Sequence, residues 1–125
     1  MTDAPLVLCA DDDEDILALV TLRLERAGYE VVQAVDGDRA LQLARERLPA
    51  LAVLDVTMPR RTGLEVLQEL RADEATRGIR VMLLSARVQE TDVEGGLGAG
   101  ADAYLAKPFR AAELVEKVGE LLGRA

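Results

Sequence analysis

The sequence contains no histidine and no tryptophan, and it has a single cysteine, Cys9. Without histidine the chain lacks a common ligand of zinc enzymes, the base of a Ser-His catalytic pair, and the residue that a histidine phosphodonor needs. One cysteine excludes an internal disulfide and fits a reducing compartment. No apolar run approaches the roughly 20 residues of a membrane span, and no signal peptide is visible at the N-terminus. We therefore expect a cytoplasmic protein that does not enter a membrane.

Acidic residues outnumber basic ones, which gives the 125-residue chain a formal net charge of −8. A surface of this sign is repelled by nucleic acid and by anionic lipid, so we expect neither to be a direct partner. Half of the residues are hydrophobic, which excludes a disordered chain. We expect one domain over residues 1–125, which at this length buries about two-thirds of the surface that the unfolded chain exposes.

Short apolar runs alternate with segments of helical periodicity along the whole chain. Five strands are predicted, near residues 5–10, 30–34, 50–55, 79–84 and 102–106. Five helices are predicted, over 14–27, from a cap at Asp36 or Asp38 to Leu48, from Thr62 to Leu70, over 89–99, and from 110 onward. Strands that alternate with helices in this way form a parallel sheet covered on both faces. We therefore expect an α/β fold, a single doubly wound (βα)5 domain with a parallel five-stranded sheet.

Apolar residues at helical spacing mark the expected inward faces of the helices. They are Ile16, Val20 and Leu24 in the first helix, Ala40, Leu41, Ala44 and Leu48 in the second, Leu67 and Leu70 in the third, and Leu114, Val118, Leu121 and Leu122 in the last. Gly28 suits the end of the first helix, and Thr62 with Glu65 has the form of a capping box. The segment 89–99 contains three glycines, each costing up to about 1 kcal/mol in a helix interior, so we expect that helix to be short or mobile.

Acid, hydroxyl and base stand at the ends of four predicted strands. Asp11-Asp12-Asp13 follows the first strand, Asp55 ends the third, Ser85 follows the fourth, and Lys107 follows the fifth. Open α/β sheets bind ligands outside the carboxyl ends of their strands, so these side chains should converge. Two carboxylates about 4 Å apart repel each other by roughly 4 kcal/mol at an effective dielectric near 20. The cluster therefore predicts a phosphoryl-transfer site that holds a cation.

The order of these residues resembles the receiver domain of two-component response regulators (CheY-like) over essentially the whole chain. The resemblance is carried by Asp11-Asp12, by Asp55-Val56-Thr57-Met58-Pro59 with Gly63, by Ser85-Ala86, by Gly100-Ala101-Asp102-Ala103-Tyr104, and by Lys107-Pro108-Phe109. It implies the strand order 2-1-3-4-5 of flavodoxin-like folds and a cis peptide between Lys107 and Pro108. Because the sequence ends with the last predicted helix, we expect no effector domain; a stand-alone receiver and a receiver cut from a longer chain both remain open.

The resemblance assigns Asp55 as the phosphoacceptor, a carboxylate that attacks phosphorus and holds it as an acyl phosphate. It also implies a Mg²⁺ site formed by Asp11, Asp12, Asp55 and the main-chain carbonyl of Thr57, which are oxygen ligands of the kind that this ion prefers. An alternative is that the acidic run only caps the first helix. For Asp13 we favour that capping role. Lys107 is assigned to a phosphate oxygen as a compact positive charge.

By the same resemblance, Ser85 donates its hydroxyl to the phosphoryl group, and Tyr104 changes rotamer in response. The alternatives are a turn residue for Ser85 and simple packing for Tyr104. Thr57 and Arg87 flank the path of the attacking water and should tune the lifetime of the acyl phosphate. These two residues are one of three departures from the common pattern. Arg60, Arg61 and Thr62 replace the more usual small residue, Met and Asp, and Arg110-Ala111-Ala112-Glu113 lacks a Ser or Thr cap for the last helix.

The predicted function is a Mg²⁺-dependent signalling switch that is phosphorylated by a sensor histidine kinase or a phosphotransfer protein. Its output would pass to an unknown downstream protein through the face of the fourth helix, fifth strand and fifth helix, from a monomer or a phosphorylation-induced dimer. It would be no enzyme beyond its own phosphorylation and dephosphorylation. A haloacid-dehalogenase-like phosphohydrolase fits less well, because 11–15 lacks the Thr or Val of the motif Asp-x-Asp-x-Thr/Val. A flavodoxin would need hydroxyls and backbone amides in its first loop, which here is acidic.

Overall fold

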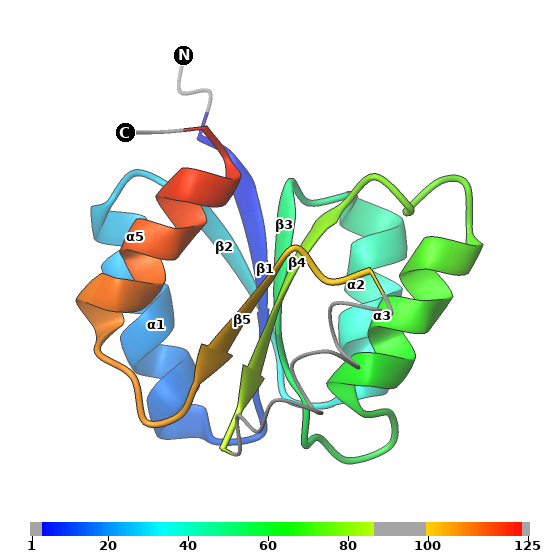
Figure 1. Ribbon diagram of the computed structural model, residues 1–125, viewed down its shortest axis with the longest axis horizontal. Coiled ribbons are helices and arrows are strands. Elements are labelled where there is room, and N and C mark those ends of the chain that lie inside the picture. Colours follow the sequence, from blue (N-terminus) through cyan, green and yellow to red (C-terminus); the bar gives the residue numbers. More distant parts are fainter. Residues whose placement is uncertain (1–3, 87–99, 124–125) are drawn as a thin grey trace.

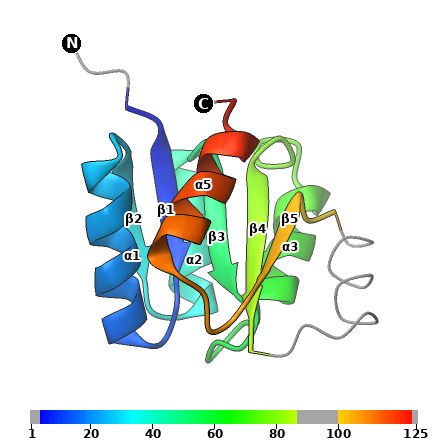
Figure 2. The same cartoon turned by 60° about the vertical axis from the view of Figure 1, so that its left-hand side comes forward.

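The computed structural model describes residues 4–86 and 100–123, which form a parallel five-stranded sheet with helices on both faces (Figure 1). The strands are β1 (Leu6–Ala10), β2 (Glu30–Ala34), β3 (Leu51–Asp55), β4 (Arg80–Ser85) and β5 (Ala103–Ala106). The helices are α1 (Glu14–Arg26), α2 (Gly37–Arg47), α3 (Gly63–Ala72) and α5 (Ala111–Leu121). The strand order is β2-β1-β3-β4-β5, with all neighbours parallel, as Figure 2 shows. The predicted fold class and strand order are confirmed.

Two apolar cores lie on opposite faces of the sheet because successive side chains of a strand point to opposite sides. Leu8, Leu54 and Leu83 face α2 and α3, and all three are fully buried. Val53 and Met82, each one position away along its strand, face α1 and α5. Figure 1 shows this division, with α1 and α5 on one side of the sheet and α2 and α3 on the other. The apolar runs of β1, β3 and β4 are therefore central strands that are buried on both faces, whereas β2 and β5 are more exposed strands at the edges of the sheet.

Capping residues account for where the helices begin. Asp13 accepts hydrogen bonds from the backbone N–H groups of Asp15 and Ile16, which confirms its capping role. Asp36 caps α2 by accepting from the N–H of Arg39, so the choice between Asp36 and Asp38 falls on Asp36. The capping box at the start of α3 is complete, whereas the N-cap of α5 is Arg110, which makes no side-chain capping hydrogen bond, as the sequence predicts. Gly28, with a φ of 98°, follows Ala27, the C-cap of α1.

The predicted helix faces are incomplete in α1 and wrong at one position in α2. In α1, Ile16 packs against the core as a partly buried residue, and Leu17, which the prediction did not include, is more deeply buried at 4% exposed. The second helix ends at Arg47, and Leu48 is its C-cap in a left-handed conformation, with 54% of its surface exposed. Pro49 explains this end, because a proline disfavours the right-handed helical conformation in the residue before it.

The peptide between Lys107 and Pro108 is cis, as the resemblance implies. In α5, Leu114 and Val118 are buried, and Leu121 and Leu122 pack against the same core as partly buried residues. Among the described residues, no helix has both the length and the apolar character needed to cross a membrane. The helix predicted over 89–99, with its glycines, and Arg87 lie outside the described residues.

Candidate functional site

Three charged side chains from three strand ends meet at the carboxyl edge of the sheet. Asp11 follows β1, Asp55 ends β3, and Lys107 follows β5. The Lys107 ammonium lies 2.9 Å from Oδ2 of Asp11 and 3.2 Å from Oδ2 of Asp55. Both carboxylates are almost completely buried, at 2% and 4% exposed. The fold thus brings together charged side chains from three strand ends that are 44 and 52 positions apart in the sequence.

The backbone fixes each of these side chains. Asp11 Oδ1 accepts from the N–H of Asp13 at 2.9 Å, and Asp55 Oδ1 accepts from the N–H of Thr57 at 3.2 Å. Each aspartate therefore uses one oxygen for the N–H two residues onward and the other for Lys107. The N–H of Lys107 donates to the carbonyl of Ser85 at 2.7 Å, which holds the lysine at the end of β4. The three charged residues are therefore held at the strand ends by hydrogen bonds to the backbone.

Asp12 completes an acidic group with Asp11 and Asp55. One carboxylate oxygen from each residue lies within 4.8 Å of the others, and Asp12 is the exposed member. Oδ2 of Asp11 is buried, and among the described residues its polar partner is the Lys107 ammonium. Three converging carboxylate oxygens are the donor set of a hard divalent cation such as Mg²⁺. The residues present therefore fit a magnesium ion.

Burial and charge shift the pKa values of the two partners. Burial, reinforced by the negative charge of Asp11, raises the pKa of Asp55 from 3.8 to about 6, although Lys107 and the Thr57 N–H act in the opposite direction. Burial by itself would lower the pKa of Lys107, but its contacts with Asp11 and Asp55 outweigh this and raise the pKa. At neutral pH Asp55 is therefore ionised beside the Lys107 ammonium, and an acidic site of this kind favours a further cation.

Ser85 and Tyr104 lie on the sheet side that faces α2 and α3. Tyr104 is paired with Leu83 across β4 and β5, and it packs against the same core as a partly buried residue. Ser85 is two residues beyond Leu83 on β4 and therefore points to the same face. It is partly buried and directly neighbours Lys107 through the backbone. Thr57 is exposed at the rim of the site, and Arg87 falls outside the described residues.

A close contact between the β3–α3 loop and the start of α2 was not predicted from the sequence. The loop from Asp55 to α3 lies against the first residue of α2, where a Cβ on Gly37 would be 2.0 Å from the carbonyl oxygen of Arg61. The same loop is held by ion pairs from Arg60 to Asp36 and from Arg61 to Asp38. The triplet Asp36-Gly37-Asp38 was the only sequence feature that could have indicated this contact. Its partners, Arg60 and Arg61, are more than 20 positions away, so only the fold reveals it.

Comparison with known proteins places these features in a family. A family model described as the response regulator receiver domain matches residues 7–119. The chain is 47% identical over 121 residues to the transcriptional regulatory protein PrrA of Mycobacterium tuberculosis, a match that covers 97% of this chain and 51% of PrrA. It is 45% identical over 120 residues to the DNA-binding dual master transcriptional regulator RpaA of Synechocystis sp., covering 96% of this chain and 50% of RpaA. The chain thus spans about half the length of these curated relatives.

A solved structure agrees over the whole domain. The crystal structure of a putative response regulator from Chloroflexus aurantiacus superposes with a TM-score of 0.91 at 34% sequence identity, covering 98% of this chain and 100% of that one. The strand order, the acidic group and the lysine at the end of β5 therefore occur in a chain whose sequence and fold both match the same family.

Proposed function

The chain belongs to the response regulator receiver domain family of two-component systems, and on that premise we propose that it is a phosphorylation switch. Asp55 would accept a phosphoryl group from the phosphohistidine of a sensor histidine kinase or phosphotransfer protein. The observation that carries this proposal is the buried cluster in which Lys107 lies within 3.2 Å of carboxylate oxygens of both Asp11 and Asp55. A structural ion pair needs one carboxylate, whereas a second buried carboxylate and an adjacent third acid suit a site for a cation and a phosphoryl group.

Asp55 has the properties of a phosphoryl acceptor. Its pKa of about 6 leaves it ionised at neutral pH, and the Thr57 N–H holds one carboxylate oxygen. One oxygen attacks phosphorus as the P–N bond to the donor histidine breaks, and the imidazole leaves with the bonding electrons and takes up a proton. The product is an acyl phosphate on Asp55. Lys107, protonated between the two aspartates, can pair with an oxygen of the new phosphoryl group.

Asp11, Asp12, Asp55 and the Thr57 carbonyl are the residues that would hold Mg²⁺. The ion supplies positive charge for the equatorial oxygens of a loose phosphoryl transition state. The chain's own contribution is to fix the carboxylates on strand ends, so that little rearrangement is needed when the phosphoryl group arrives. Thr57, exposed at the rim, and Arg87 would tune the access of water to the acyl phosphate and hence its lifetime.

Output would follow from Ser85 and Tyr104, which share one side of the sheet. The Ser85 hydroxyl would move toward the phosphoryl group, and Tyr104 would occupy the space left behind. This change would alter the surface of β5 and α5, together with the helix that the sequence predicts over 89–99, and so change the binding of a downstream protein. Whether the active form is a monomer or a phosphorylation-induced dimer would follow from the same surface.

The proposal concerns signalling and not metabolic catalysis. PrrA and RpaA are named as transcriptional regulators, RpaA as a DNA-binding one, but each is about twice as long as the segment that it shares with this chain. We propose proteins, and not nucleic acid, as the direct partners of the receiver, in keeping with its net charge of −8. A cytoplasmic location, where a kinase would have access to ATP, belongs to the same proposal.

The test is phosphorylation of the purified protein by acetyl phosphate with and without Mg²⁺, followed on Phos-tag gels and by intact mass. We expect one phosphoryl group per chain, dependent on Mg²⁺ and lost in Asp55→Asn. Asp13→Asn is the matched control, because Asp13 is also acidic and close to the site but caps α1, and Asn caps equally well. A base-labile phosphate on Asp55→Asn would show that the phosphoacceptor is another residue.

A further inference from the structure

The loop between β3 and α3 determines how Asp55 is held. Its base is closed by a hydrogen bond from the N–H of Gly63 to the carbonyl of Val56 at 3.0 Å. Gly63 leaves no room for a side chain, since a Cβ there would be 2.4 Å from the carbonyl oxygen of Asp55. Within the loop, the Thr57 N–H contacts the Asp55 carboxylate. The position of this loop therefore sets both the orientation of the carboxylate and the place of the Thr57 carbonyl.

The far end of the same loop rests on the start of α2. The N–H of Gly37 donates to the carbonyl of Pro59 at 3.2 Å, and the backbone of Arg61 fills the space where a Gly37 side chain would be. Arg60 has a φ of 71°, a left-handed conformation that is costly for a residue with a side chain. Such a conformation persists only where surrounding contacts hold it.

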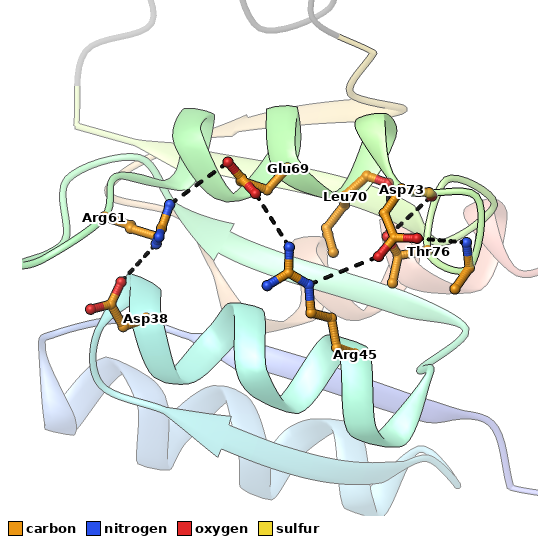
Figure 3. A network of polar contacts seen from close by, with 8 residues as sticks. Asp38, Arg45, Arg61, Glu69, Leu70, Asp73 and Thr76 are labelled. Carbon is orange, nitrogen blue, oxygen red and sulfur yellow. Dashed lines mark hydrogen bonds and ion pairs between the residues drawn. The ribbon is translucent and has the colours of Figure 1, made fainter.

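Arg61 supplies contacts of that kind to two helices at once. Its Nε lies 2.7 Å from Oδ1 of Asp38 in α2, and its Nη1 lies 3.9 Å from Oε1 of Glu69 in α3. Figure 3 shows Arg61 between these two carboxylates, and Arg45 further along the contact between α2 and α3. Arg45 makes comparable ion pairs, 3.2 Å to Glu69 and 4.0 Å to Asp73, but it contacts no residue of the loop in the figure or among its ion pairs.

From these contacts we infer that Arg61 is a positioning residue for the phosphorylation site. Its guanidinium fixes the β3–α3 loop to α2 and α3, and through that loop it fixes the Asp55 carboxylate and the Thr57 carbonyl in the arrangement that binds Mg²⁺. Asp38 acts with it as the nearer anchor. The inference rests on the proposed function, because it assigns these two oxygen groups to the metal.

Stability and positioning can be separated in this case. The side chains of Arg61 and Asp38 are 39% and 51% exposed, and ion pairs this accessible contribute little to global stability. Loss of Arg61 should therefore leave the fold in place but release the loop. Loss of Arg45 removes the same kind of ion pairs between α2 and α3, so it should change stability slightly and leave the loop in place.

The experiment compares wild type with Arg61→Ala, Arg61→Lys, Asp38→Asn, the double variant Arg61→Ala/Asp38→Asn, and the control Arg45→Ala. Three quantities are measured: amide hydrogen exchange of Gly37 and Thr57 without metal, the Mg²⁺ dissociation constant by calorimetry, and the rate of phosphorylation by acetyl phosphate. Circular dichroism confirms that each variant is folded, and Arg61→Lys, which keeps the charge, provides a milder change should Arg61→Ala unfold.

For Arg61→Ala we expect faster amide exchange at Gly37 and Thr57 and a Mg²⁺ affinity about three- to tenfold weaker than that of wild type. A loss of this size is at or below the lower end of the effects seen when groups that orient metal ligands are removed. Asp38→Asn should act in the same direction, and the double variant should lose no more than Arg61→Ala, because the two residues act through one contact. Arg61→Lys should fall between wild type and Arg61→Ala. Arg45→Ala should stay within about twofold of wild type in all three quantities.

Unchanged amide exchange and unchanged Mg²⁺ affinity in Arg61→Ala would overturn the inference. An equal loss of Mg²⁺ affinity in Arg45→Ala would also overturn it, because the effect would then come from a general weakening of the contact between α2 and α3. A wild-type protein that binds Mg²⁺ but gains no phosphoryl group would contradict the proposed function alone. The amide hydrogen exchange and the Mg²⁺ affinity of the variants would then still decide whether Arg61 positions the loop. A wild-type protein that binds no Mg²⁺ would overturn both.

Discussion

Replacing Asp55 by asparagine should stabilise the metal-free protein, although it removes the proposed phosphoacceptor. Burial and the charge of Asp11 raise the pKa of Asp55 from 3.8 to about 6 in the folded state. Between these two values the native state binds more protons than the unfolded state, so stability falls as the pH rises through that window and remains lower above it. An ionised Asp55 therefore works against folding at neutral pH, and asparagine imitates its neutral form.

The size of the effect follows from the shift. About two pKa units at 1.36 kcal/mol each set a ceiling of about 3 kcal/mol at pH 7.5. Relaxation of Lys107, which loses one of its two carboxylate partners, should reduce the observed gain to about 1–2 kcal/mol. With an unfolding entropy of about 2.1 cal/mol/K per residue, a chain of 125 residues should gain about 4–8 °C in Tm.

The assay is thermal unfolding by circular dichroism in EDTA, at pH 7.5 and at pH 4. At pH 7.5 Asp55→Asn should melt above wild type, and at pH 4 the difference should nearly vanish, because wild-type Asp55 is then protonated in the folded state. Asp13→Asn, which removes an exposed charge but keeps a good helix cap, should show no comparable gain. A lower Tm for Asp55→Asn at pH 7.5 would mean that its pairing with Lys107 outweighs burial and repulsion, contrary to the reasoning.

Three further predictions concern the metal, the backbone and the switch. Mg²⁺ at ten times its dissociation constant should stabilise wild type by about 1.4 kcal/mol, and Asp12→Ala should reduce this gain; a Tm independent of Mg²⁺ would rule out the site. Gly63→Ala should cost about 1–3 kcal/mol in urea unfolding because its Cβ has no space, whereas Gly78→Ala, with nothing within 4 Å, should not; equal costs would contradict the packing argument. Beryllofluoride, a phosphoryl mimic, should change amide exchange from Ser85 through Tyr104, and a change confined to the β3–α3 loop would refute the proposed output.

Local patterns in the sequence account for most of the fold. All five strands were predicted to within one residue at each end. The signal was clearest for β1, β3 and β4, because strands buried on both faces are almost entirely apolar. Capping at Asp13 and Thr62 was readable for a similar reason, since a cap and the N–H groups that it satisfies lie within three residues of each other. The order of the strands, by contrast, came from resemblance to a family, because periodicity carries no information about which strands are neighbours.

The features that were missed depend on contacts between distant residues or on competing local effects. Leu48 has the spacing of a core residue, but the restriction imposed by Pro49 ends the helix before it. The ion pair of Arg61 with Asp38 spans 23 positions, and no pattern within one helix predicts it. For the site, the sequence indicated which strand ends carry charge, whereas the 2.9 and 3.2 Å contacts of Lys107 with both aspartates required the fold.

The acidic site conflicts with the stability of the domain that contains it. Asp11 and Asp55 are buried where the rest of the sheet is apolar, and Lys107 neutralises only one of the two charges. Proteins keep such local conflicts mainly at functional sites, where a ligand relieves them. A cation bound by the carboxylates, or a phosphoryl group paired with Lys107, would interact most strongly with the arrangement in which these charges are close together. Such a difference in affinity between two conformations is what shifts the equilibrium between them. Under the proposed function, the repulsion that makes Asp55 unfavourable in the metal-free protein would be relieved by the ligand, and this difference in free energy would drive the response of the site.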